Sequence, residues 1–199
     1  MPLQALALLW LQPRAAYRLV MASRPGNSSV LLYVVAWYLS WLEHWLTSAM
    51  PSLLVALGVI LLPLFAVLLL YFQGWVLRQV GRWLDGSGDP LGARVAISWG
   101  GVPVTLATLF GIIGYFFWGE QLLWIEQMQW PGNPLVLLVS LLPLVFGIYS
   151  LFTTSIMLGE ANGFSAWRGL ATLLLSLVLI LIAAAFLAVL VSVLVLLLR

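Results

Sequence analysis

The residues of this chain that could carry chemistry are few, and the most suggestive lie in the stretch Gly86-Ser87-Gly88-Asp89. A carboxylate beside glycines could serve in hydrolysis inside a membrane, but that chemistry needs two carboxylates that share a proton. No second aspartate lies in any apolar segment, and Asp89 directly precedes Pro90. Aspartate followed by proline is typical of a helix N-cap and first turn, so we interpret Asp89 as a cap.

Two other arrangements suggest a ligand or a catalytic group. His44, the single histidine, follows Glu43, but a metal site would need further ligands and none is near. The glycines before Asp89 could bind a phosphate at a helix start, yet no Lys-Ser/Thr pair follows, as a nucleotide-binding loop requires. Cysteine is absent, which removes thiol nucleophiles and thiolate ligands. We therefore expect no catalytic residue, no metal ion and no cofactor.

The composition of the chain is that of an integral membrane protein. Of its 199 residues, 64% are hydrophobic and 7% are charged, whereas soluble domains carry about 25% charged residues. Long apolar runs favour helical spans, because helices satisfy their own backbone polar groups in lipid. All eight basic residues are arginines, and they are scattered, so nucleic acid is not an expected partner. We predict an all-α fold, a polytopic membrane helix bundle.

About five transmembrane spans are predicted, after a cytosolic or interfacial N-terminal segment. Residues 1–29 form this segment, in which residues 3–24 are expected on the membrane surface, and residues 30–199 form the membrane domain. The outer segment 119–133 is too polar to span and is expected at the outer interface. The spans cover about 30–49, 51–73, 90–118, 134–158 and 167–198.

The arginines orient these spans, because arginine is enriched in loops that face the cytosol. With a cytosolic N-terminus, every arginine except the last residue, Arg199, lies inside. The outer loops then hold acidic residues and no arginine before that last one. The inner arginines are Arg14, Arg18, Arg24, Arg78, Arg82, Arg94 and Arg168.

Three of the predicted spans carry a proline near their middle, at Pro63, Pro103 and Pro143. Each proline removes a helix hydrogen bond and bends its helix. The third span also carries a face of small residues, which lets helices approach closely within the fold or in an oligomer. This face comprises Gly100, Gly101, Ala107, Gly111 and Gly114.

The most informative window runs from Arg78 to Pro103 and joins the second and third spans. Its polar, glycine-rich sequence between apolar segments must face water. One interpretation is structural: glycine caps one helix end, Asp89 caps the next helix, and arginines anchor the inner face. The other is contact with lipid headgroups or a membrane protein. The candidate binding residues are Arg78, Arg82, Asp85, Gly86, Gly88, Arg94, Gly100, Gly101 and Pro103.

This window resembles the Yip family, the Ypt/Rab-interacting membrane proteins and their bacterial relatives. The turn RWLDGSG (82–88), the helix and step RVAISWGGVP (94–103), and GFSAWR (163–168) before the last span carry the resemblance. The acidic N-terminal domain of eukaryotic members is missing from this sequence. The resemblance therefore implies a bacterial, multi-pass protein of the inner (cytoplasmic) membrane.

Together these features predict a non-catalytic membrane protein that acts as a scaffold or accessory subunit. The expected partners are membrane lipids and other membrane proteins, or further copies of the same chain. The alternative is a transporter or channel component for a small or lipid-like solute, suggested by the mid-span prolines. The predicted spans hold no charged residue at mid-depth, which argues against proton coupling.

Overall fold

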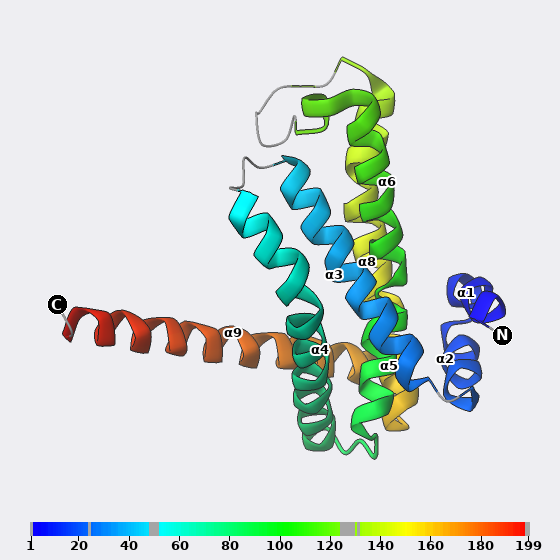
Figure 1. Ribbon diagram of the computed structural model, residues 1–199. Helices are drawn as coiled ribbons and strands as arrows, with labels where there is room; N and C mark the ends of the chain where they lie inside the picture. Colours follow the sequence, from blue (N-terminus) through cyan, green and yellow to red (C-terminus); the bar gives the residue numbers. More distant parts are fainter. Residues whose placement is uncertain (1, 24, 48–51, 124–129, 131, 198–199) are drawn as a thin grey trace.

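The computed structural model describes residues 2–23, 25–47, 52–123, 130 and 132–197. Throughout this part of the chain the regular structure is helical, with no strand (Figure 1), which confirms the predicted all-α class. The helices are α1 (Pro2–Leu11), α2 (Pro13–Ala22), α3 (Gly26–Thr47), α4 (Ser52–Trp83), α5 (Pro90–Gly100), α6 (Val102–Trp118), the 3-10 helix η1 (Gly119–Leu123), α8 (Pro134–Asn162) and α9 (Ala166–Leu197).

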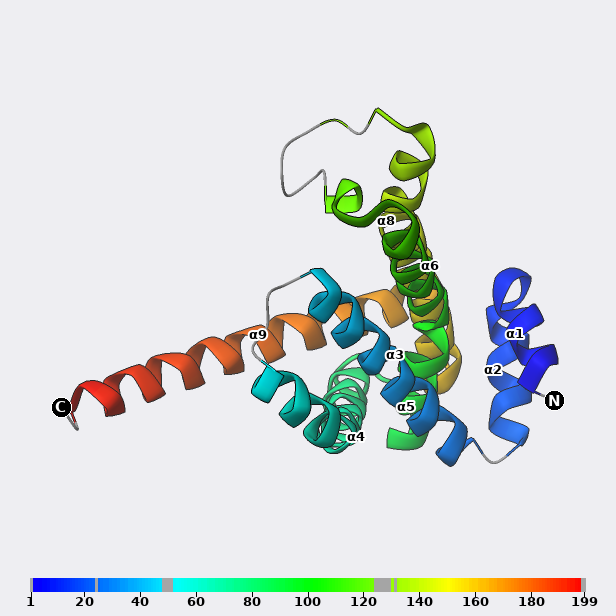
Figure 2. The same cartoon turned by 45° about the horizontal axis from the view of Figure 1, so that its top comes forward.

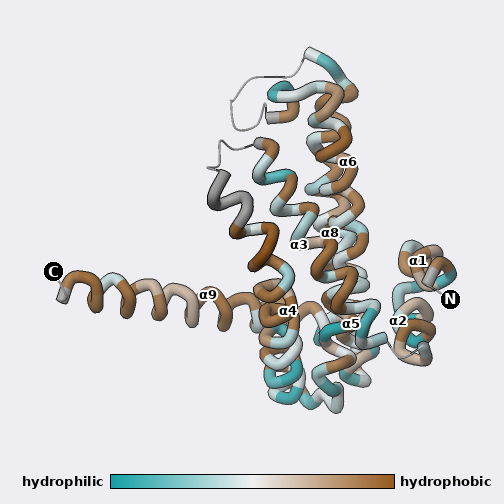
Figure 3. The backbone as a smooth tube through the Cα atoms, viewed as in Figure 1, coloured by the Kyte–Doolittle hydropathy of each residue, from teal (hydrophilic) through white to brown (hydrophobic). Residues whose placement is uncertain are grey.

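The helices form a membrane bundle from which one helix projects. Helices α3, α4, α8 and the α5–α6 pair lie alongside one another, whereas α9 leaves them at a large angle (Figures 1 and 2). Apolar residues predominate along α9, and polar residues are frequent where the end of α4 meets α5 (Figure 3). Within the described residues, four helical stretches are long and apolar enough to cross a membrane, namely Leu57–Trp83, Pro90–Leu122, Pro134–Asn162 and Ala166–Leu196.

The predicted first span corresponds to α3, which has 22 residues and carries Glu43 and His44 near its C-terminal end. This helix is not among those four apolar stretches, so the first span stays a prediction. The end of this predicted span and the turn that follows it, residues 48–51, lie outside the described residues, as do residues 124–129 and 131 of the outer segment 119–133.

Helix α4 continues beyond the second predicted span, which ends near Gln73. It ends at Trp83, so Arg78 and Arg82 lie on the helix rather than in the loop between the second and third spans, where they are expected. The added turns contain two glycines, each of which costs a helix about 1 kcal/mol relative to alanine. Packing offsets that cost, because one face of these turns is buried, at Val76, Leu77 and Val80.

The N-terminal segment forms a helical hairpin rather than one surface helix. Gln12 separates α1 from α2, and Pro13 is the first residue of α2, where a proline is well tolerated. Trp10 stacks on Tyr149 with ring centroids 5.4 Å apart, and the Tyr149 hydroxyl donates to the Trp10 carbonyl over 2.5 Å. Tyr149 lies near the middle of α8, so the hairpin reaches well along that helix.

The core lies between the hairpin, α5 and the inner half of α8. Leu9, Val95 and Leu158 are fully buried there, and Trp99 is nearly so. By contrast, residues 181–196 of α9 are all exposed. Such uncovered apolar length is expected of a helix whose solvent is lipid.

Candidate functional site

Helix α4 ends in a Schellman motif. The Gly86 N–H donates to the Gly81 carbonyl over 2.9 Å, and the Asp85 N–H donates to the Arg82 carbonyl over 3.1 Å, the two bonds that define the motif. Asp85 takes the left-handed position, with φ of 63°. A glycine cap at this helix end is therefore a wrong prediction. Aspartate serves instead, because its short polar side chain tolerates this conformation better than most.

Helix α8 ends in the same motif, with Gly163 in the left-handed position at φ of 74°. The Phe164 N–H donates to the Gly159 carbonyl over 2.9 Å. The two helix ends meet, because the Ser87 N–H donates to the carbonyl of Asn162 over 3.1 Å. We name this contact the helix-end junction, which comprises residues 81–89 and 159–164.

Asn162 holds the junction together. Its side chain is buried, and its Nδ2 donates to the Leu158 carbonyl over 2.8 Å. Its Oδ1 faces three glycines: a methyl group on Gly81, Gly86 or Gly88 would lie 2.6, 2.8 or 2.7 Å from that oxygen. Real Cβ atoms essentially never approach this closely, so the predicted residues Gly86 and Gly88 are required by packing against Asn162.

Asp89 begins α5 as predicted. Its Oδ1 accepts from the Gly92 N–H over 2.7 Å, and Pro90 follows at the first helical position. This confirms Asp89 as an N-cap.

Helix α2 docks beside this cap. A methyl group on Gly92 would lie 2.6 Å from the Tyr17 hydroxyl, which places the ring directly against α5. Burial raises the pKa of Tyr17 above its ordinary value, and the nearby carboxylates of Asp89 and Glu160 add to the effect. Arg18 Nε donates to Glu160 Oε1 over 2.6 Å, and this hydrogen bond raises the pKa of Arg18. The N-terminal hairpin is thus fixed to the ends of α5 and α8.

The three arginines of the predicted window have different surroundings. The Arg94 guanidinium lies 4.0 Å from the centroid of the Tyr71 ring. This cation–π contact covers one face of the guanidinium. The Nε of Arg78 is buried and has no hydrogen-bond partner among the residues described. Arg82 is exposed. Arg82 is therefore the member of this set that a partner could reach.

The remaining predicted residues, Gly100, Gly101 and Pro103, lie at the step between α5 and α6. Helix ends leave backbone groups without intrahelical partners, and α8 supplies these partners at the step. Thr153 Oγ1 donates to the Gly100 carbonyl over 2.8 Å, and the Val104 N–H donates to Ser150 Oγ over 2.9 Å.

Gly100 is required at this step because any side chain there would overlap Thr154, including its Cα. The small face also packs inside the chain further along α6: a methyl group on Gly114 would lie 2.9 Å from Val139 Cγ1. The small residues therefore serve contacts within the fold, one of the two roles predicted for them.

A cavity of about 280 Å³ lies beside the step, between α3 and the α5–α6 pair. Its lining includes the hydroxyl-bearing residues Ser40, Ser98, Thr105 and Thr108. The Ser98 Oγ is buried and has no partner within the part of the chain that the structure describes. Sequence reasoning missed both this cavity and Asn162, because each depends on contacts between distant segments.

The helices that border the junction carry exposed aromatic and charged side chains. Trp83 at the end of α4 is 69% exposed, and Trp167 at the start of α9 is 77% exposed. We name this set the exposed rim, which comprises Arg82, Trp83, Asp85, Trp167 and Arg168. No group of three or more potential metal ligands was found among the described residues.

Comparison with known proteins gives one finding. A family model described as the Yip1 domain matches residues 7–197. No curated protein and no solved structure matches the chain.

Proposed function

The chain belongs to the Yip1 family, and from this premise we propose that it is a non-catalytic scaffold or accessory subunit. It binds other membrane proteins or lipids at the exposed rim of the helix-end junction. Its place is the bacterial inner membrane, with the junction facing the cytosol. This binding surface excludes Gly100, Gly101 and Pro103, because Gly100 packs against α8, Gly101 lines the internal cavity and Pro103 is fully buried.

The observation that supports this proposal is the contact between Asn162 and the junction glycines. The contact holds the turn after α4 in one conformation, so Arg82, Trp83 and Asp85 are presented in fixed positions. A surface that is ordered before binding loses less conformational entropy when the partner arrives. Tryptophan and arginine are also the residues that most often dominate binding energy at interfaces.

Interfacial anchoring is the competing explanation for exposed tryptophans, because tryptophan is enriched at membrane surfaces. The two explanations make different predictions for Trp83→Ala and Trp75→Ala. Trp75 lies on the same helix and is 52% exposed, so it is a matched control. Binding of a partner at the exposed rim requires Trp83 but not Trp75, whereas anchoring in lipid involves both tryptophans.

The test is co-purification of the full chain from membranes in mild detergent. We expect Trp83→Ala to lose a co-purifying protein that the unaltered chain and Trp75→Ala both retain. The proposal is wrong if the same set of proteins co-purifies with all three forms.

A transport role is the second candidate, and the hydroxyl-lined cavity beside the α5–α6 step favours it. Hydroxyl groups and a bent helix can line a path for a small neutral solute without charged residues. In that case, solute flux into proteoliposomes should fall when Ser98→Ala and Thr105→Val remove hydroxyls from the lining. Flux that is unchanged in both variants would exclude this role for the cavity.

A further inference from the structure

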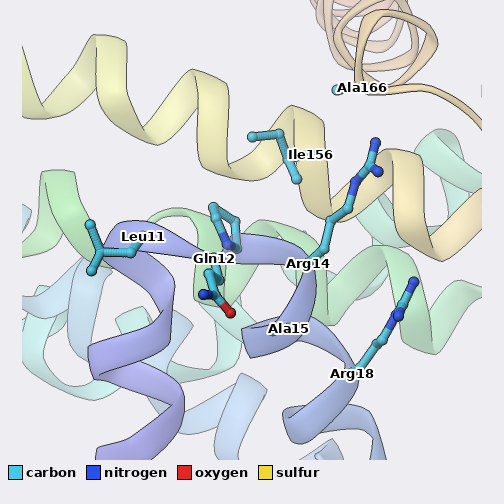
Figure 4. Close-up of a pocket in the computed structure, with 8 residues that line it drawn as sticks. Leu11, Gln12, Arg14, Ala15, Arg18, Ile156 and Ala166 are labelled. Atoms are coloured by element: carbon cyan, nitrogen blue, oxygen red, sulfur yellow. The ribbon is translucent and has the colours of Figure 1, made fainter.

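A groove that is separate from the exposed rim lies beside the turn between α1 and α2 (Figure 4). Its volume is about 690 Å³. The turn between α1 and α2 forms one wall, and α8 and the start of α9 form the other. The lining residues are Leu11, Gln12, Pro13, Arg14, Ala15, Arg18, Ile156 and Ala166.

The charged residues of this groove come from one face of α2. Arg14 and Arg18 are four residues apart, so they lie on the same side of the helix, and Figure 4 shows both guanidinium groups extending in the same direction. Arg18 is paired with Glu160 at 2.6 Å, whereas Arg14 makes no ion pair with any described residue. The groove and its border therefore carry one uncompensated positive charge, from Arg14.

The start of α2 adds to this positive character. Gln12 is the N-cap, and its side chain makes no capping hydrogen bond. The first backbone N–H groups of a helix lack intrahelical partners and carry partial positive charge. Arg14 and Ala15 belong to this first turn, and both line the groove. The backbone N–H groups at the start of α2 and the Arg14 side chain therefore both favour an anionic ligand.

The apolar part of the lining comes mainly from helices that can span a membrane. Ile156 lies within the stretch Pro134–Asn162, which can span a bilayer, and Ala166 begins the stretch Ala166–Leu196. Leu11 is 87% exposed at the tip of the hairpin. A ligand that fits this lining has an anionic group next to Arg14 and a hydrocarbon part next to Leu11 and Ile156.

We propose that this groove binds an anionic phospholipid. Its phosphate lies between the guanidinium of Arg14 and the start of α2, and one acyl chain follows Leu11 and Ile156. Guanidinium and phosphate form paired, charge-assisted hydrogen bonds, which are stronger than neutral ones. The site is distinct from the exposed rim and does not depend on the function proposed for it.

The test is lipid binding by the purified full-length chain in detergent micelles that contain phosphatidylglycerol, followed by native mass spectrometry. We expect Arg14→Ala to weaken binding about ten-fold, the loss expected for a charge-assisted hydrogen bond. Arg94→Ala removes an arginine that lies outside both the groove and the exposed rim, with its guanidinium on the Tyr71 ring, and we expect it to leave binding unchanged. Equal losses in the two variants would mean that general positive charge attracts the lipid, and the proposal would be wrong.

Two further variants separate the groove from its charge. Ile156→Trp fills the groove without altering charge, and we expect it to abolish binding while circular dichroism shows unchanged helix content. Glu160→Gln releases Arg18 from its ion pair, so we expect binding to tighten by a few fold. Unaltered binding in Ile156→Trp would overturn the proposal, as would weaker binding in Glu160→Gln.

The source of the phosphate is decided by three probes. We expect phosphatidylglycerol to bind, while phosphatidylcholine and inorganic phosphate bind at least about ten-fold more weakly. The choline ammonium of phosphatidylcholine balances the charge of its phosphate, and inorganic phosphate lacks acyl chains. Inorganic phosphate that binds as tightly as the lipid would show a soluble anion site instead. Phosphatidylcholine that binds as tightly would show that the groove does not select for net negative charge, and the proposal would be wrong.

Discussion

The side-chain oxygen of Asn162 and the α-carbon of Gly86 are in such close contact that a methyl group on Gly86 would lie 2.8 Å from Oδ1. Gly86 lies beyond the end of α4 and Asn162 is the last residue of α8. The same methyl group would also meet the Phe164 ring at 2.8 Å. The contact joins the turn after α4 to the end of α8. It therefore determines how the exposed rim is presented.

Gly86→Ala should destabilise the protein by about 1–3 kcal/mol, the usual cost of forcing an extra methyl group into a packed site. Gly147→Ala is the matched control, because Gly147 lies inside α8 with nothing within 4 Å of its Cβ position. That control should be neutral or stabilising by up to about 1 kcal/mol, since alanine favours helices over glycine. Thermal unfolding of both variants in detergent, followed by circular dichroism, measures the difference. Equal stability of the two variants would contradict the packing described for Gly86.

Gly100→Ala should be at least as damaging as Gly86→Ala, at about 3 kcal/mol. The obstacle at Gly100 includes the Cα of Thr154, at 2.7 Å from the added methyl group, and backbone cannot rotate away as a side chain can. The expected result is a lower unfolding temperature and faster proteolysis between α5 and α6. A Gly100→Ala variant as stable as Gly147→Ala would show that α5 and α8 are not in contact at this point.

Asp85→Gly should stabilise the fold, and Asp85→Ala should destabilise it. Asp85 has a φ of 63°, a conformation that costs ordinary side chains about 1–2 kcal/mol and costs glycine almost nothing. The two substitutions remove the same carboxylate, so an effect of charge would shift both in one direction. Opposite shifts in unfolding temperature are therefore the signature of the left-handed cap.

Alkaline pH should loosen the N-terminal hairpin through Tyr17. Burial raises the pKa of Tyr17 in the folded protein above its ordinary value of 10.0. A group whose pKa is higher in the folded state contributes stability below its unfolded pKa and loses it as pH rises beyond that value. We expect protection of α2 from proteolysis to decline above about pH 10 in the unaltered chain. Tyr17→Phe cannot ionise, so its protection should change less over that range.

Local signals in the sequence predicted much of the fold. Asp89 with Pro90 marks the start of α5, and Pro134 marks the start of α8, because a cap and a proline at the first helical position act within a few residues. The apolar runs likewise identified the long helices, because hydropathy is also a property of the local sequence. Helix α4 continues ten residues beyond the end of the second predicted span, because its last turns are stabilised by burial rather than by composition.

The candidate site could be predicted only in part. The predicted window contains Gly86 and Gly88, but the Asn162 side chain that they contact lies more than seventy residues away, and nothing local indicates that contact. The sequence also grouped Gly100 with the junction, whereas the structure places it against Thr154 at the α5–α6 step. The direction in which α9 leaves the bundle likewise depends on long-range packing (Figure 1).

The central claim is that the exposed rim binds a partner because the junction holds it in place. The most direct measurement is photo-crosslinking in intact membranes, with a photoreactive side chain introduced in place of Trp83, and at Trp75 as control. We predict a discrete protein adduct from position 83 alone, and a weaker adduct when Asn162→Ala loosens the junction. Identical crosslinking from both positions, or an adduct that Asn162→Ala leaves unchanged, would contradict the account.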